Sequence, residues 1–187
     1  MMSFSLQFVL VLIGTFMIAL VLTPLVRLFS FKIDAVDYPN ARRINTKPMP
    51  SAGGLSIVIA FSIATLIFIP MLTSTTAPIK SYLSYTLPVV GAGWIIALTG
   101  LIDDVKELSA KKKMIGILLA ASLVWFLTDF RLNDFKIPFG GPLLHFEPWL
   151  SYLLTVIWIV AITNAVNLID GLDGLVSGVS IISLVTM

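Results

Sequence analysis

The sequence contains no cysteine, a single histidine and few charged residues. Without cysteine the chain forms no disulfide or thiolate metal site, and it offers no cysteine nucleophile. Charged residues are 12% of the total, whereas soluble domains carry roughly 25%. The net charge is only +2, and no basic tract indicates binding to nucleic acid. Water is therefore not the main solvent of this chain.

Long apolar runs take the place of the missing charge, with 58% hydrophobic residues and a mean hydropathy of +1.01. A helix needs about 20 apolar residues to cross a bilayer. We therefore predict an all-α, polytopic transmembrane helix bundle with five full spans and a truncated sixth. Residues 1–187 form one integral membrane domain in this prediction, as the N-terminal part of a longer protein. The expected spans are Ser5–Phe29, Gly54–Leu72, Thr86–Ile102, a short one at Lys113–Thr128, Trp149–Ala165 and Leu175–Met187.

The basic residues predict the orientation of these spans. Nine of the twelve lysines and arginines fall in segments that share one side. The positive-inside rule places 30–53, 103–112 and 166–174 in the cytoplasm and the N-terminus outside. On the outer side, Gly140-Gly141 between short apolar stretches predicts a small β-hairpin. His145 lies in this outer segment, so catalysis by histidine is not expected from these residues.

The first cytoplasmic segment runs from Asp34 to Gly54 and is rich in proline and glycine, which predicts an ordered loop. Gly53 and Gly54 open the next span, where backbone N–H groups could face an anion. The alternative is a basic loop that only contacts lipid headgroups. Composition does not separate the two interpretations.

The second segment places Asp103 and Asp104 at the end of an apolar helix. Acidic residues at a helix C-terminus oppose the helix dipole and cost stability. They could simply be solvated, but carboxylates at the edge of a span favour a functional role. Adjacent helical residues point about 100° apart. One carboxylate could therefore contact a metal or phosphate while a neighbour such as Lys113 holds the other.

The third segment repeats a polar residue at every third position: Asn164, Asn167, Asp170 and Asp173. This spacing gives a slowly drifting stripe on one side of a helix. No lysine or arginine lies between residues 137 and 187. Distant lysines, a metal ion or a ligand must therefore compensate these acids.

The acids and amides of the second and third segments offer hard oxygen ligands, which suit Mg²⁺, or Mn²⁺, better than zinc or copper. Such an ion is usually completed by substrate phosphates in phosphoryl transfer. Lysines in the same cytoplasmic segments would offset further phosphate charge: Lys47, Lys111, Lys112 and Lys113.

Three motifs resemble those of the polyprenyl-phosphate N-acetylhexosamine-1-phosphate transferases. They are Ala35–Arg43 with Pro48–Gly54, Gly100–Asp104 with Leu108-Ser109, and Asn164–Gly174. The resemblance is closest to the undecaprenyl-phosphate GlcNAc-1-phosphate transferases of bacterial envelope polysaccharides, including wall teichoic acid and lipopolysaccharide. It implies transfer of GlcNAc-1-phosphate from a UDP-sugar to undecaprenyl phosphate with release of UMP. The implied location is the bacterial cytoplasmic membrane, with the active site facing the cytoplasm.

The resemblance also implies roles for single residues. Asp103 and Asp104 match the catalytic pair, and Asn167 matches a metal ligand together with Asp104. Lys47, Ser51 and Lys113 match phosphate contacts. Asn164, Asp170 and Asp173 match further substrate-binding positions, with Asp173 as a uridine contact. The implied partners are the UDP-sugar, the lipid phosphate and the membrane, with a homodimer left open.

Two departures from the family pattern bear on activity. Asn45 stands where the family often has histidine, and the family's later acidic and histidine-containing motifs would lie beyond Met187. We therefore expect residues 1–187 alone to be inactive. Alternatives are the phospho-MurNAc-pentapeptide transferase of peptidoglycan synthesis, a cation-coupled transporter and a non-catalytic membrane scaffold. A transporter would place its acids near the middle of the bilayer in repeated halves, and no internal repeat is evident.

Overall fold

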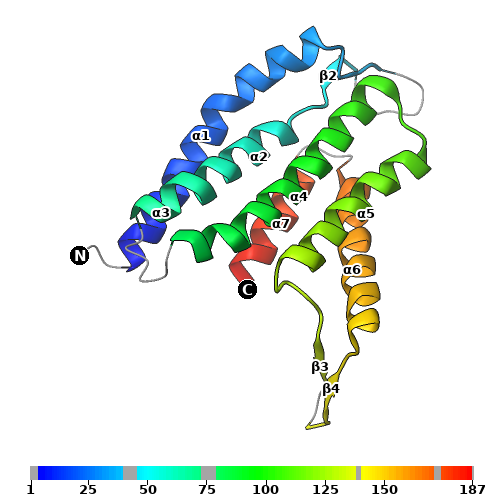
Figure 1. Cartoon of the computed structure of the whole chain (residues 1–187). Helices are drawn as coiled ribbons and strands as arrows, with labels where there is room; N and C mark the ends of the chain where they lie inside the picture. The colour runs from blue at the N-terminus through cyan, green and yellow to red at the C-terminus, as the bar shows by residue number, and fades with distance from the viewer. Residues whose placement is uncertain (1–3, 40–45, 73–78, 138–139, 171–173, 187) are drawn as a thin grey trace. The chain divides into compact units, whose positions relative to one another are not determined.

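The structure is a computed structural model that describes residues 4–39, 46–72, 79–137, 140–170 and 174–186. Most of this length is helical, and Figure 1 follows the elements in chain order. The internal contacts divide the chain into two compact units, Met1–Asp129 and Phe130–Met187.

The first unit is built from long apolar helices. In chain order they are α1 (Phe4–Lys32), α2 (Gly54–Ile63) continued by the π-helix η1 (Ala64–Phe68) and α3 (Ile69–Leu72), then α4 (Ile79–Lys106) and α5 (Ala110–Leu127). The stretches Ser5–Lys32, Gly54–Met71 and Ile79–Lys106 are each long and apolar enough to cross a membrane. α5 has 18 residues, but lysines fill its first turn, so its apolar part is short, as the sequence predicted.

Small residues form the buried interior of this unit, while large apolar side chains lie on its outside. The buried alanines of the helices include Ala60, Ala64, Ala92, Ala120 and Ala121. Phe16 and Leu28 of α1, by contrast, are 62% and 68% exposed. Small residues let helix backbones approach closely, and lipid solvates large side chains as well as a protein core would. This distribution is that of a helical membrane protein.

Two close approaches fix how the helices pack. A Cβ added at Gly116 of α5 would lie 2.3 Å from the Thr99 Oγ1 of α4. One added at Gly14 of α1 would lie 2.9 Å from the Phe68 ring. The contact with Thr99 therefore requires glycine at position 116, whereas a Cβ at position 14 would require the Phe68 ring to move.

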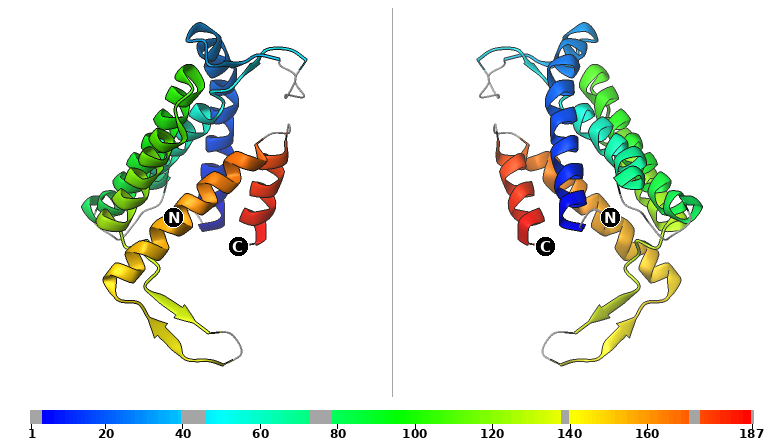
Figure 2. Two further views of the ribbon diagram at one scale, coloured as in Figure 1. Left: turned by 90° about the vertical axis from the view of Figure 1, so that its right-hand side faces the viewer. Right: turned by 90° about the vertical axis from the view of Figure 1, so that its left-hand side faces the viewer.

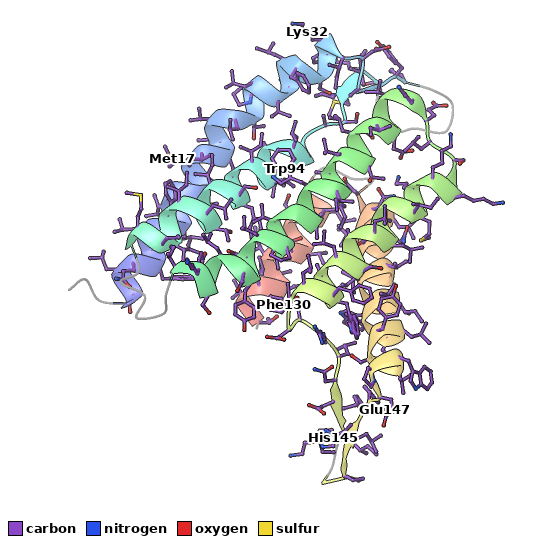
Figure 3. The ribbon with its side chains drawn as sticks, in the orientation of Figure 1. Met17, Lys32, Trp94, Phe130, His145 and Glu147 are labelled. Atoms are coloured by element: carbon purple, nitrogen blue, oxygen red, sulfur yellow. The ribbon has the colours of Figure 1, made fainter. Side chains whose placement is uncertain are left out.

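A polar contact links α2 to α4. The Trp94 indole N–H of α4 donates to the Ser62 hydroxyl of α2 at 3.0 Å, and Figure 3 shows Trp94 beside these helices.

The π-helix η1 has an identifiable cause. Pro70 has no N–H and its ring clashes with the carbonyl four residues earlier, which disturbs the helix before it. The Tyr82 hydroxyl of α4 donates to the Thr65 carbonyl of η1 at 2.6 Å. The Thr65 carbonyl, which lies in the irregular part of this helix, thus gains a hydrogen-bond donor from the neighbouring helix α4.

The second unit consists of a hairpin and two helices. β3 (Asp134–Lys136) pairs antiparallel with β4 (Leu143–His145), and α6 (Pro148–Ile169) and α7 (Leu175–Thr186) follow. α6 is long and apolar enough to cross a membrane, whereas α7 is shorter. Gly140 in the hairpin loop has a φ of 86°, a conformation that glycine adopts without strain. The predicted hairpin is confirmed.

The prediction of a helical membrane protein is confirmed, while the spans differ in detail. Four helical stretches of the described residues are long and apolar enough to cross a membrane, where the sequence predicted five full spans. The difference is α5, because of its lysines. α4 also runs to Lys106 instead of ending near Ile102. Asp103 and Asp104 therefore belong to its last turns.

The Gly116–Thr99 contact predicts the effect of a single methyl group. We expect Gly116→Ala to destabilise the protein by about 1–3 kcal/mol, because the new Cβ overlaps Thr99. Thermal unfolding in detergent measures the loss. Gly93→Ala on α4 is the matched control, since nothing lies within 4 Å of its Cβ position. Adding Thr99→Ala to Gly116→Ala should recover part of the loss, and equal melting temperatures for the two glycine variants would contradict the contact.

Candidate functional site

A short ribbon orders the segment between α1 and α2. β1 (Val36–Asp37) pairs antiparallel with β2 (Met49–Pro50), with Val36 opposite Pro50 and Asp37 opposite Met49. The ribbon joins the end of α1 to the start of α2. It fixes the position of Asp37 and of the following Tyr38.

A buried carbonyl anchors this ribbon. Ala35 is fully buried, and its carbonyl accepts hydrogen bonds from the Ser51 N–H at 3.1 Å and the Ser51 hydroxyl at 2.9 Å. The buried Ser30 hydroxyl of α1 donates to the same oxygen. Val26 and Ala52 pack around Ala35. Ser51, predicted as a phosphate contact, thus also connects α1 to the ribbon.

The end of α4 depends on Asp103. Glu107 has a φ of 46°, which terminates the helix in the left-handed region without a glycine. The Glu107 N–H donates to the Asp103 carbonyl at 2.8 Å, and the Leu108 N–H donates to the Asp103 Oδ1 at 3.0 Å. One residue therefore satisfies the two N–H groups that follow the helix.

Asp103 also reaches the next helix. The Lys113 Nζ lies 2.6 Å from the Asp103 Oδ2, with side chains 30% and 20% exposed, respectively. This ion pair ties the first turn of α5 to the last turn of α4. Lys113, predicted as a phosphate contact, is thus already bound to a carboxylate in this structure.

Asp104 faces a different set of groups. The Ser51 hydroxyl lies near its carboxylate, and the charges of Asp103, Asp37 and Lys113 act on it. A cavity of about 340 Å³ opens beside it. The residues that line this cavity are Val36, Asp37, Tyr38, Asp103, Asp104, Glu107 and Leu108. Because Asp103 is held by Lys113 and Leu108, Asp104 is the member of the pair available to a ligand.

Tyr38 is the aromatic residue of the cavity wall. Its hydroxyl donates to the Asp34 Oδ1 at 2.9 Å, and Asp34 has a φ of 59°. This hydrogen bond, with the negative charge of Asp34, raises the pKa of the Tyr38 phenol. The phenol therefore remains a donor at neutral pH and stays tied to Asp34.

The third motif lies in the second unit, at the end of α6. The Asn164 amide donates to the Val160 carbonyl of its own helix at 2.8 Å. Asn167 is exposed on the last turns of α6, and Asp170 is exposed at the helix end. Asp173 lies outside the described residues. The described part of the predicted polar stripe is thus helical through Asn167, with Asp170 at the end of α6.

The structure brings together three predicted residues of the first two motifs, Ser51, Asp103 and Asp104, and the predicted Lys113 of α5. Lys47 is exposed on the segment before β2. The cavity also contains Asp37, Tyr38 and Glu107, which were not predicted as site residues. Asp37 and Tyr38 lie within the first motif and Glu107 follows the Asp pair by three residues. Including every acidic residue of the matched motifs would have found Asp37.

The carboxylates of the cavity suit a magnesium ion that is completed by other ligands. Among the described residues, no three His, Cys, Asp or Glu side chains are close enough to hold a metal ion by themselves. Mg²⁺, however, is usually held by one or two carboxylates, with water and substrate phosphates completing the shell. Asp104 and the other carboxylates that line the cavity can supply the one or two carboxylate ligands that Mg²⁺ needs.

The fold and the site together define a helical membrane protein with an acidic cavity at a helix end. The family described as "Glycosyl transferase family 4" matches residues 86–187, and the chain belongs to this family. The match includes the second and third motifs, and it confirms the family that the motifs indicated.

Curated relatives are also similar to this chain. A probable undecaprenyl-phosphate N-acetylglucosaminyl 1-phosphate transferase of Bacillus subtilis is 38% identical over 160 residues, covering 85% of this chain and 41% of the relative. Decaprenyl-phosphate N-acetylglucosaminephosphotransferases of Mycolicibacterium smegmatis and Mycobacterium leprae are 34% and 32% identical, covering 75% and 76% of this chain. The chain spans 34% and 35% of those two relatives. No solved structure matches the chain significantly.

The contacts of the Asp pair predict unequal effects on stability. We expect Asp103→Ala to lower the free energy of unfolding by about 1–3 kcal/mol, because Leu108 and Lys113 both lose a charged partner. Asp103→Asn should lose less, since it keeps an acceptor for the Leu108 N–H. Asp104→Ala is the matched control and should change stability by less than about 0.5 kcal/mol. Thermal unfolding in detergent measures all three, and a larger loss at Asp104 would reverse the assignment.

Proposed function

We propose that the protein transfers N-acetylglucosamine 1-phosphate from a UDP-sugar to undecaprenyl phosphate and releases UMP, as the first membrane step of envelope polysaccharide synthesis. The observation that carries the proposal is the acidic cavity at the end of α4, where Asp104 faces the residues of the first motif. The family and the names of the relatives supply the substrate class.

The reaction exchanges one phosphoanhydride for another. An oxygen of the lipid phosphate attacks the sugar-bearing phosphorus of the UDP-sugar. The bond from this phosphorus to the bridging oxygen of the diphosphate breaks, and UMP leaves with that oxygen. The lipid phosphate is mostly dianionic at neutral pH, by analogy with phosphorylated side chains. A strong base is therefore unnecessary, and catalysis consists mainly of positioning and charge neutralisation.

Each residue has a role in this proposal. Asp104 would orient the reacting phosphates through the divalent ion that it holds, while Asp103 positions α4 and α5 through Lys113. Mg²⁺ held by Asp104 would neutralise diphosphate charge at the cavity. Asn167 of the second unit is proposed as a metal ligand on the motif match alone. The residues assigned to substrate binding are Lys47, Ser51, Lys113, Asn164, Asp170 and Asp173.

We place the protein in the bacterial cytoplasmic membrane, with the cavity towards the cytoplasm and the N-terminus outside. Support comes from the lysines at the same end of the first unit as the cavity. Lys32 ends α1, Lys106 ends α4 and Lys111–Lys113 begin α5. Clustering of basic residues at one membrane side is typical of the cytoplasmic side.

Replacing Asp104 tests the proposed activity. We expect Asp104→Asn in the intact gene product to lower UMP release from UDP-GlcNAc by about 10²-fold or more, because a charge contact made in the transition state is lost. Membranes supplied with undecaprenyl phosphate and radiolabelled UDP-GlcNAc provide the assay. Asp129→Asn, an exposed acid just beyond α5, is the control and should retain activity. Absence of UMP release by membranes that contain the wild-type protein would contradict the proposal.

Removing divalent ions tests the role of the acidic cavity separately. Chelation with EDTA should abolish UMP release, and added Mg²⁺ should restore it. If Asp104 holds the ion, Asp104→Asn with residual activity should need about tenfold or more Mg²⁺ for half-maximal rate, since even indirect metal contacts are worth that much. An unchanged Mg²⁺ requirement in that variant would exclude Asp104 as a ligand.

A further inference from the structure

The outer hairpin of the second unit is firmly attached to the start of α6. The Leu132 N–H donates to the Thr155 Oγ1 at 2.9 Å, and the Ser151 hydroxyl donates to the Asn133 Oδ1 at 2.9 Å. The Phe146 N–H donates to the Asn133 carbonyl at 2.7 Å. Ser151 and Thr155 are buried. These hydrogen bonds therefore fix the base of the hairpin to the first turns of α6.

The register divides the hairpin into two different faces. Phe135 lies opposite Leu144, and residues directly opposite each other share a face. The alternation of side chains places Ile137 on this same face. Phe135 and Leu144 are 51% and 43% exposed. One face is thus apolar and unburied within the described structure.

The other face of the hairpin carries charge. Asp134 lies opposite His145, and Lys136 lies opposite Leu143. The His145 ring and the Asp134 carboxylate are in direct contact. Charged groups are costly to remove from water. This face therefore belongs in solvent.

The hairpin also lies at the end of a membrane span. α6 begins at Pro148, three residues after β4, and is long and apolar enough to cross a bilayer. Figure 2 shows that the hairpin turns sharply away from the axis of α6 and does not continue it. Phe130 and Trp149, at its base, are 64% and 68% exposed, and aromatic side chains concentrate at membrane interfaces. Figure 3 labels Phe130, His145 and Glu147 along this segment.

We propose that the β3–β4 hairpin is an interfacial membrane anchor, whose Phe135–Leu144 face lies on the outer leaflet of the bilayer while its Asp134–His145 face remains in water. The apolar face continues the lipid-contacting surface of α6 across the headgroup region. An amphipathic element of this kind gains affinity from the apolar area it buries at the acyl boundary. The anchor concerns the outer side of the membrane and is independent of the proposed transferase reaction.

Adjacent leucines on opposite faces provide a matched test. Residues 1–187 contain no cysteine, so Leu144→Cys and Leu143→Cys can each carry one nitroxide spin label in the intact gene product, after replacement of any cysteine elsewhere. The labelled protein is reconstituted into vesicles of phosphatidylethanolamine and phosphatidylglycerol. Electron paramagnetic resonance then compares collisions with oxygen, which enters hydrocarbon, and with a nickel chelate, which remains in water.

The expected result is an oxygen-to-nickel collision ratio about threefold or more higher at position 144 than at 143, because polar chelates are excluded from hydrocarbon. Phe135→Cys and Lys136→Cys should repeat the contrast on β3. Equal ratios typical of water at 143 and 144 would overturn the anchor. Low collision rates with both reagents at 144 would show protein, such as a second copy of the chain, covering this face, and would also overturn it. High oxygen ratios at both positions would refute the assignment of faces.

Discussion

The ion pair between Asp103 and Lys113 is the constraint on which the candidate site depends. Asp103 ends α4 by accepting from the Leu108 N–H, and Lys113 joins this end to the start of α5. An ionised carboxylate at a helix C-terminus opposes the helix dipole, so these contacts offset an intrinsic cost. With Asp103 engaged in this way, its neighbour Asp104 faces the cavity. One carboxylate thus fixes the geometry, and the other is available for chemistry.

The helix packing of the first unit is explained by the hydrocarbon of the membrane, which acts as an apolar solvent. In hydrocarbon, backbone polar groups need partners within the protein, and the contact of Tyr82 with the Thr65 carbonyl supplies one at the π-helix. Small residues occupy the helix contacts, since lipid accommodates large side chains equally well. At the helix ends, water can hydrogen-bond to backbone groups, so irregular backbone is tolerated there. The β1–β2 ribbon lies there, anchored by the buried Ala35 carbonyl.

The electrostatics of the cavity connect this architecture to the proposed reaction. Asp37, Asp103, Asp104 and Glu107 all line it, and its described lining includes no lysine or arginine. A bare diphosphate would be repelled by this wall, whereas a diphosphate that arrives with a divalent ion would be attracted to it. The acidic wall is therefore the physical reason for the metal dependence that we propose. The hairpin on the second unit serves a different need, since its two faces match the two sides of a membrane interface.

The sequence by itself determined the helical membrane class, the hairpin at Gly140-Gly141 and the three polar motifs. Hydropathy and glycine turns are local properties, and each can be read without knowing the partners. The sequence also suggested that Lys113 could hold one carboxylate of the pair. Only the tertiary structure decided that this carboxylate is Asp103 while Asp104 faces the cavity, and that Asp37, Tyr38 and Glu107 line it. The left-handed Glu107 and the extension of α4 to Lys106 also escaped prediction. Their physical reason is that hydrogen bonds and ion pairs between segments distant in sequence fix where a helix ends and which way each carboxylate points.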